Sequence, residues 1–215
     1  MNTIERIAAG AAAVMFMISQ AATAEPIRTP EGNMPMVRWA VVESTPGDMA
    51  KMQEIAARTV APAAAGEAGT YAIYGGVDAE NPDVMRLLEI YESCEAYRIH
   101  CTGEMFQDYR AERFPFLRNL KFLDVNGIAL EQKPEGVGTF VLITSYEVRP
   151  ERLAEYQRLA KAEAVRAVRD DPAVMGIFIT AERDAPNLIH TMGIYRDEAS
   201  YQKYVESEAY GEHLR

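Results

Sequence analysis

The sequence has few of the residues from which metal and redox sites are usually built. It contains two cysteines and three histidines in 215 residues. It also has no excess of positive charge, because 22 Lys and Arg stand against 32 Asp and Glu, for a net charge of −10. An acidic protein repels the phosphate backbone of nucleic acids. We therefore expect no metal site and no nucleic-acid partner.

Several common catalytic signatures are missing as well. The chain has no G-x-x-x-x-G-K-[ST] loop, no G-x-G-x-x-G turn, no H-E-x-x-H helix and no G-x-S-x-G elbow. These patterns mark nucleotide-binding loops, zinc-protease helices and α/β-hydrolase nucleophiles. Their absence argues against those classes of enzyme.

The chain also lacks an apolar run of the roughly 20 residues that a membrane-spanning helix needs. The apolar run over 7–18 leads into S-Q-A-A-T-A-E-P, where Ala22 and Ala24 have the small-x-small spacing that a signal peptidase accepts. We predict a signal peptide over residues 1–24 and a periplasmic or secreted mature protein without membrane contact. An uncleaved membrane anchor is the alternative, which the short run disfavours.

An internal repeat with a period of 104 residues organises the rest of the chain. Without gaps, 12 of the 74 aligned pairs from Arg38 to Ala111 are identical. The identities include Pro46 over Pro150 and the pair Ile90-Tyr91 over Ile194-Tyr195. Because the apolar residues also keep their phase, we interpret the match as a duplication and not as a chance similarity.

Each copy predicts the element order β-α-β-β-α-β of a split βαβ unit, although the second copy ends before its last strand. Prolines 46 and 150 are expected just before the first helices. The second and third strands are expected at 70–75 and 84–91 in the first copy and at 176–181 and 188–195 in the second. The second helices are expected at 94–113 and from 198 onward.

These elements predict an α+β fold of two ferredoxin-like (split βαβ) repeats, forming an internal pseudo-dimer of the dimeric α/β-barrel type. Repeat 1 is assigned to 36–130, a linker to 131–138 and repeat 2 to 139–215. The first repeat closes with a strand near 117–130, and the second has no counterpart. An open sheet edge invites pairing, so we predict a homodimer.

One face of the strand at 84–91 is unusual. Successive side chains of a strand point to opposite faces, so Glu89 and Tyr91 share a face. A carboxylate in an apolar strand needs a partner or a pocket, and burial would raise its pKa. We expect this face to line a ligand cavity and not to lie under a helix.

The two cysteines, Cys94 and Cys101, fall in one predicted helix. Seven residues of helix separate their Cα atoms by about 10 Å, whereas a disulfide needs less than about 7 Å. We therefore expect no bond between them within the chain and interpret them as small apolar residues; a bridge between chains is the minor alternative.

The string E-N-P-D-V-M-R-L-L-E-I-Y-E-S-C-E-A-Y-R-I-H (80–100), followed by F-x-x-Y from Phe106 to Tyr109, resembles the antibiotic biosynthesis monooxygenase superfamily, and most of all its quinol monooxygenase branch. Met105 replaces the family's second histidine, and Tyr204 stands at the place of His100 in the second repeat. The resemblance implies a cofactor-independent monooxygenase, without metal or flavin, that acts with O₂ on quinol-like or polyphenolic aromatic substrates. Proton abstraction from the substrate would precede O₂ insertion.

The same resemblance implies roles for single residues. His100 is the expected catalytic base, since imidazole titrates near neutrality, and Glu89 is the second catalytic candidate. The expected substrate-binding residues are Tyr91, Trp39, Tyr71, Tyr195 and Tyr204. Structural roles for His100 and Trp39 are the competing interpretations.

Two other functions stay open. A non-catalytic periplasmic binder of small aromatic ligands would explain the eroded second motif equally well. A haem-binding or haem-degrading relative would use a histidine near the position of His100 as an axial ligand, although the acidic chain and Tyr204 argue against two haem sites.

Overall fold

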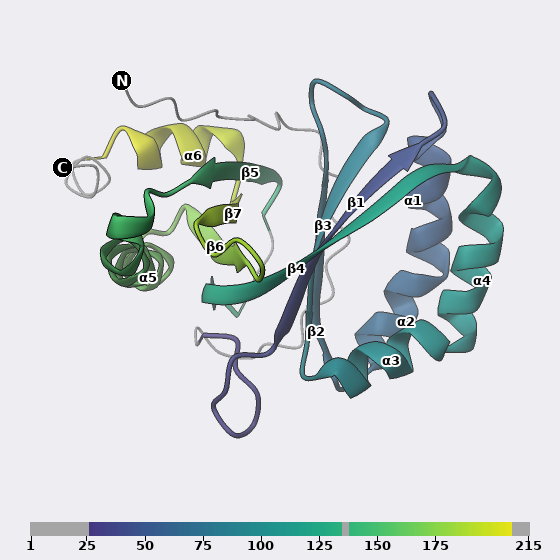
Figure 1. The fold of residues 1–215 in the computed structure, drawn as a ribbon. Coiled ribbons are helices and arrows are strands. Elements are labelled where there is room, and N and C mark those ends of the chain that lie inside the picture. The colour runs from purple at the N-terminus through teal and green to yellow at the C-terminus, as the bar shows by residue number, and fades with distance from the viewer. Residues whose placement is uncertain (1–25, 135–137, 208–215) are drawn as a thin grey trace. The chain divides into compact units, whose positions relative to one another are not determined.

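The computed structural model describes residues 26–134 and 138–207. The chain divides into two compact units between Asp124 and Val125, and Figure 1 shows the elements of each. The predicted signal peptide, residues 1–24, lies outside the described residues. None of the described helices is both long and apolar enough to span a membrane.

The first unit is an antiparallel sheet with helices on one face (Figure 1). Strand β3 pairs with β1 on one side and β2 on the other, and the first half of β4 lies next to β1. The strands are β1 (Met36–Ser44), β2 (Thr70–Val77), β3 (Val84–Tyr91) and β4 (Leu117–Gln132). The helices are α1 (Met49–Arg58), α2 (Val60–Gly66), α3 (Cys94–Thr102) and α4 (Glu104–Arg113).

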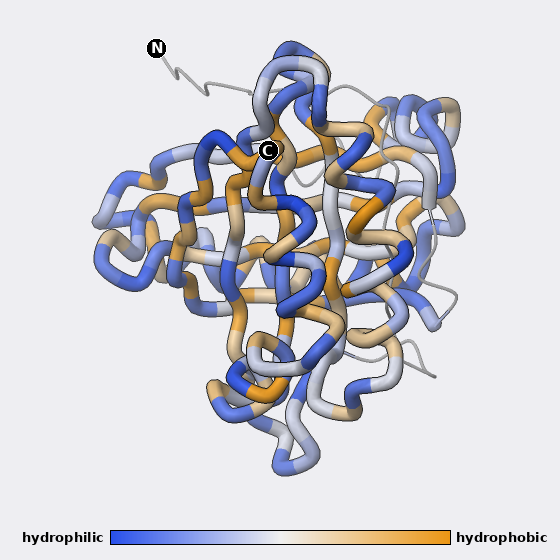
Figure 2. The backbone as a smooth tube through the Cα atoms, turned by 90° about the vertical axis from the view of Figure 1, so that its right-hand side faces the viewer, coloured by the Kyte–Doolittle hydropathy of each residue, from blue (hydrophilic) through white to orange (hydrophobic). Residues whose placement is uncertain are grey.

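The core of the first unit forms where α1 meets the sheet. Met49 and Met52 are buried on one face of α1 and pack against Val42 and Met85. Each such side chain stabilises the fold by about 1.5–3 kcal/mol on burial. Figure 2 shows hydrophobic residues along many inner segments of the backbone and hydrophilic ones at many of the outer turns.

The second unit repeats the elements of the first. It contains β5 (Phe140–Glu147), α5 (Leu153–Asp170), β6 (Val174–Glu182), β7 (Leu188–Tyr195) and α6 (Glu198–Val205), with the short turn η2 (Pro150–Arg152) before α5. Both ends of β7 lie 104 residues after those of β3, and α5 spans the positions that correspond to α1 and α2 together. The predicted α+β fold of two ferredoxin-like repeats is confirmed.

The first long helix is broken only in the first unit. Thr59 separates α1 from α2, and its hydroxyl donates to the carbonyl of Ile55 at 2.6 Å. Pro62 follows in the next turn, where a proline cannot donate to the helix and clashes with the preceding turn. Arg166 stands at the corresponding place in α5, which is continuous.

Strand β4 supplies the closing strand that the second repeat was expected to lack. Its second half, from Val125 to Gln132, pairs antiparallel with β6, so the sheet of the second unit has the order β4-β6-β7-β5. The expectation of an open edge in the second repeat was wrong, because β4 has 16 residues and each half serves one unit. The edge that motivated the predicted homodimer is thus covered, and self-association stays a prediction without that support. Strand β4 also extends two residues into the expected linker, 131–138.

The second long helix is broken as well. A single helix was expected over 94–113, but Gly103 ends α3 and caps α4 with an extended backbone. The break leaves His100 in the last turn of α3 and Phe106 in the first turn of α4. Cys94 and Cys101 both lie on α3 with free thiols.

Candidate functional site

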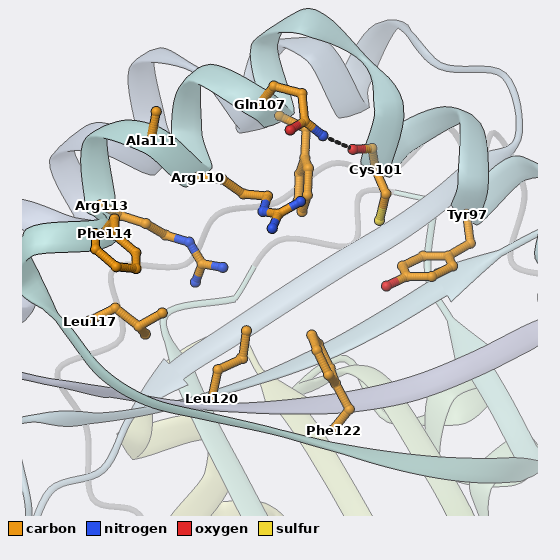
Figure 3. A pocket seen from close by; sticks show the side chains of 11 residues that line it. Tyr97, Cys101, Gln107, Arg110, Ala111, Arg113, Phe114, Leu117, Leu120 and Phe122 are labelled. Carbon is orange, nitrogen blue, oxygen red and sulfur yellow. Dashed lines mark hydrogen bonds between the residues drawn. The ribbon is translucent and has the colours of Figure 1, made fainter.

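The first unit contains a cavity of about 730 Å³ between α3, α4 and the first half of β4 (Figure 3). Small-molecule sites commonly have volumes of about 300–1,000 Å³. Aromatic and aliphatic side chains form most of the lining: Tyr97, Phe106, Phe114, Leu117, Leu120 and Phe122. The lining also includes Cys101, Gln107, Arg110, Ala111 and Arg113.

Two arginines supply the charge of this lining. Figure 3 shows the guanidinium groups of Arg110 and Arg113 extending from α4 into the space opposite Leu120 and Phe122 of β4. Arg113 is buried, with 7% of its surface exposed, and its guanidinium carbon lies 4.7 Å from the ring centre of Tyr109. Its Nε has no hydrogen-bond acceptor among the described residues.

A buried ion pair lies next to the cavity. Arg38 of β1 stands opposite Glu89 of β3, with Nε 3.8 Å from Oε2, and 8% of the Arg38 side chain and 12% of the Glu89 side chain are exposed. The guanidinium carbon of Arg38 lies 4.5 Å from the ring centre of Tyr97 and 3.7 Å from that of Phe122. The Arg38–Glu89 pair thus contacts the lining through these two rings.

The environment of Glu89 shifts its proton affinity. Burial raises the pKa of the Glu89 carboxyl above its usual value of 4.5, and the positive charge of Arg38 is the largest opposing effect. The Tyr91 hydroxyl donates to Oε2 of Glu89 at 3.3 Å. Burial also raises the pKa of Tyr91, and it raises the pKa of Tyr97 to about 12. The two tyrosines are therefore neutral hydrogen-bonding groups at neutral pH.

His100 forms a second buried pair with a carboxylate. Its Nδ1 lies 2.7 Å from Oε2 of Glu67, the residue that caps the end of α2, and the same oxygen accepts from the Thr70 hydroxyl. A carboxylate accepts hydrogen bonds, so Nδ1–H of His100 is the donor in this contact, and Nε2 is the ring nitrogen on the side away from Glu67. Glu67 thereby sets the tautomer that a base requires.

His100, Glu89 and Tyr91 each lie one side chain away from the cavity and not in its lining. The ring of His100 packs against that of Phe106, with 4.8 Å between the ring centres. Tyr91 packs against Tyr97 at 5.3 Å and against His100 at 5.5 Å. The structure thus brings the two predicted catalytic residues and Tyr91 into one cluster under the aromatic lining.

The sheet face that carries Glu89 differs from the expectation in one respect. Glu89 and Tyr91 do share a face, but Met85 on that face packs against α1, and Tyr91 packs against His100 of α3. The expectation that this face is not covered by helices was wrong. The polar groups of Glu89 and Tyr91 lie beside the cavity, which is located next to the break between α3 and α4 at Gly103.

Trp39 and Tyr71 are not brought to the cavity. Trp39 stands opposite Leu88 on the other face of the sheet and is 2% exposed. Tyr71 lies near Glu92, whose negative charge adds to the effect of burial in raising the pKa of the Tyr71 hydroxyl. Their predicted part in substrate binding gains no support from these positions.

Tyr195 and Tyr204 lie in the apolar core of the second unit, together with Phe140 and Tyr201. The ring centre of Tyr195 lies 4.8 Å from that of Tyr201 and 5.8 Å from that of Tyr204. The Tyr204 hydroxyl donates to Glu163 at 3.2 Å. These two tyrosines take the places of Tyr91 and His100 but pack as core residues.

Gly193 explains why the second unit differs. It occupies the position of Glu89, and a Cβ atom added there would lie 2.7 Å from the hydroxyl oxygen of Tyr195. The side chain of Tyr195 therefore fills the volume in which the first unit places the Glu89 carboxylate. The positions of Arg38, Glu89 and His100 are thus occupied in the second unit by Leu142, Gly193 and Tyr204, which do not reproduce the ionisable cluster.

Sequence reasoning missed Arg38, Glu67 and Arg113. Arg38 had a signal, because it lies at the inward phase of an apolar strand, as Glu89 does. Glu67 and Arg113 gave none, since only the turn after α2 and the start of α4 at Glu104 bring them to the site. Among the described residues, no three His, Cys, Asp or Glu side chains gather in a way that could hold a metal ion.

The family follows from two separate matches along the chain. The sequence model of the antibiotic biosynthesis monooxygenase family matches residues 35–112 and again 139–215. The chain belongs to this family. The two matches correspond to the two repeats, and no protein of curated function matches the chain.

Two solved structures have the same tandem fold over most of their length. A candidate monooxygenase from Lactobacillus acidophilus NCFM is 18% identical, with a TM-score of 0.77, over 85% of this chain and 86% of that one. A candidate monooxygenase from Fusobacterium nucleatum is 16% identical, with a TM-score of 0.75, over 84% of each chain. At this level of identity the likeness concerns the fold.

Proposed function

We propose that the protein is a cofactor-independent monooxygenase of quinol-like or polyphenolic aromatic substrates, with its site in the first unit. Family membership supports the reaction class. The observation that carries the proposal is the buried cluster of Arg38, Glu89, Tyr91 and His100 next to an aromatic cavity of about 730 Å³. Buried ionisable groups beside a cavity are typical of reaction sites.

In such a reaction the substrate supplies all the electrons. Hydroquinone and O₂ give hydroxyquinone and water, so that one oxygen atom enters the ring and the other leaves as water. The first step is loss of a phenolic proton, which makes the ring electron-rich enough to pass an electron to O₂. The protein can assist this step by accepting the proton and stabilising the phenolate.

The residues of the first unit suit these two tasks. Nε2 of His100 accepts the proton, and Glu67 stabilises the imidazolium that forms through the 2.7 Å contact with Nδ1. The guanidinium of Arg113 in the lining stabilises the phenolate. Because His100 lies behind Phe106, proton transfer requires either rotation of Phe106 or a bridging water molecule.

Oxygen uptake tests this proposal. Purified mature protein should consume O₂ with members of a hydroquinone panel, without added metal or flavin. His100→Ala should abolish uptake, whereas Tyr204→Phe, which alters the corresponding position in the core of the second unit, should keep most of it. If both variants retain wild-type uptake, His100 is not the base. No uptake with any hydroquinone would contradict the proposed reaction.

A non-catalytic binder of small aromatic ligands is the second candidate, because no candidate base lies in the cavity lining itself. Spectral titration with hydroquinones in the absence of O₂, followed by O₂ uptake, separates the two functions. A haem site is less well supported, since the His100 ring is 2% exposed and is packed between Tyr91 and Phe106. Addition of haemin without a Soret shift would remove it.

Export to the periplasm or the medium is also part of the proposal, supported by the apolar run and the small-x-small site of residues 7–24. N-terminal sequencing of the protein recovered outside the cytoplasm should begin at Glu25. An intact N-terminus on a cytoplasmic protein would contradict it.

A further inference from the structure

We infer that the ligand of the first-unit cavity is an anionic aromatic molecule, a phenol that carries a carboxylate or a group of similar charge, and that Arg113 and Arg110 hold that group. This inference names the substrate class of the proposed function and therefore rests on it. It begins from the charge inside the cavity, which is opposite in sign to that of the whole chain.

The first observation concerns the side chain of Arg113. Its side chain is more than nine-tenths buried, and Figure 3 shows its guanidinium directed into the cavity. Its Nε has no acceptor among the described residues. A buried cation with an unused donor is costly unless an anion or another acceptor completes it. Tyr109, which lies under the guanidinium, offers the face of its ring and a hydroxyl oxygen that accepts a hydrogen bond from Arg113, but no negative charge.

The balance of charges around the cavity is the second observation. Two arginines line it, and no aspartate or glutamate appears among the described lining residues. The nearest buried carboxylate, Glu89, is already paired with Arg38, whose Nε is also buried without a hydrogen bond. The guanidinium groups of two buried arginines, Arg38 and Arg113, and that of the exposed Arg110 thus stand against one carboxylate whose pKa is raised by burial. The whole chain has a net charge of −10. The excess of positive charge is therefore local to the cavity and does not reflect the charge of the protein as a whole.

The apolar part of the lining indicates what the rest of the ligand is like. Phe106, Leu120 and Phe122 offer apolar surfaces around the guanidinium groups. An aromatic ring fits between such side chains, and a carboxylate on the ring can accept two parallel N–H bonds from one arginine. A phenolic carboxylate satisfies the apolar walls and the charge of the guanidinium together, whereas a neutral quinol leaves that charge without an anion.

Anaerobic titration with a matched pair of probes tests the inference. Hydroquinone and 2,5-dihydroxybenzoate differ only in the carboxylate, and the absence of O₂ keeps turnover out of the measurement. We expect the wild-type protein to bind the dihydroxybenzoate at least tenfold more tightly. Arg113→Gln should remove most of this preference, and Arg113→Lys, which keeps the charge without the planar fork, should remove only part of it.

Arg118→Gln serves as the control, because Arg118 is exposed, lies outside the lining and pairs with Glu43. It should keep the wild-type preference. If Arg113→Gln fails to fold, as judged by thermal melting, Arg110→Gln replaces it and should weaken the preference at least threefold. Equal affinity of the wild-type protein for both probes, or an unchanged preference in Arg113→Gln and Arg110→Gln, overturns the inference.

The two proposals fail in different ways. A carboxylate preference that depends on Arg113, without O₂ uptake for either probe, supports the inference and contradicts the monooxygenase. O₂ uptake with neutral hydroquinones and no preference for the carboxylate supports the monooxygenase and overturns the inference.

Discussion

At the residue scale, corresponding positions of the two repeats can be compared directly, because the first repeat has charged side chains where the second has uncharged ones. Arg38, Glu89 and His100 of the first repeat correspond to Leu142, Gly193 and Tyr204 in the second. The second set packs as an apolar aromatic core. Buried ion pairs are seldom more stabilising than well-packed apolar residues. The first repeat therefore keeps its charges at a cost in stability, which is typical of a functional site.

The pH dependence of stability reports on Glu89 directly. Because burial raises its pKa above 4.5, the folded protein binds this proton more tightly than the unfolded chain does. Its contribution to the free energy of unfolding must then fall as the pH rises from about 4.5 through the raised pKa. Glu89→Gln does not titrate, so the variant should gain stability relative to the wild type over that range.

Urea unfolding at several values between about pH 4 and pH 8 measures this difference. A difference that stays constant, or that moves in favour of the wild type as the pH rises, would show that the Glu89 carboxylate is fully compensated in the fold.

At the element scale, the repeat made much of the fold predictable. The bounds of β3 and β7 agree with the predicted strands at 84–91 and 188–195, because alternation and the shared period supported each other. The breaks at Thr59 and Gly103 and the double role of β4 were not predictable. They depend on how a turn or a strand packs against its neighbours, and the repeat pattern of the sequence does not specify that packing.

The same limit applies to the site. Periodicity placed Glu89 and Tyr91 on one face, and the resemblance selected His100. The cavity arises from the break at Gly103 and the path of β4, so its lining residues Arg113 and Phe122 could not be assigned from the sequence.

Gly193 of the inner strand β7 and Gly75 of the edge strand β2 together test how tightly the second unit is packed around Tyr195. An added Cβ at Gly193 meets the Tyr195 hydroxyl at 2.7 Å, inside a packed aromatic cluster, so Gly193→Ala should destabilise by about 1–3 kcal/mol. An added Cβ at Gly75 meets only the terminal methyl of Leu87 at 2.6 Å. That partly exposed side chain can change rotamer, so Gly75→Ala should cost less than about 1 kcal/mol. Equal losses of unfolding free energy would contradict the packing described for Tyr195.

At the scale of the whole molecule, one chain holds two copies of a unit whose corresponding positions carry different side chains. Both copies keep the fold, and β4 adds a strand to each sheet. Gly193 and Tyr204 stand in the second copy where the first has Glu89 and His100, so the cluster of Arg38, Glu89 and His100 has no counterpart at those positions.

Self-association belongs to this scale. The predicted homodimer of mature chains would have a mass near 42 kDa, twice the roughly 21 kDa of 191 residues at about 110 Da each. Sedimentation at micromolar concentration distinguishes the two masses. Because β4 supplies the strand that the second repeat lacked, a monomer would show that this strand suffices to protect the edge.

The central claim is that each chain has one ligand site, in the first unit. Anaerobic calorimetric titration of the mature protein with 2,5-dihydroxybenzoate measures the number of sites directly. We expect one molecule bound per chain, and loss of binding in Leu120→Trp, which fills the cavity, with the melting temperature used to check folding. Two molecules per chain, or binding that survives Leu120→Trp in a folded protein, would contradict it.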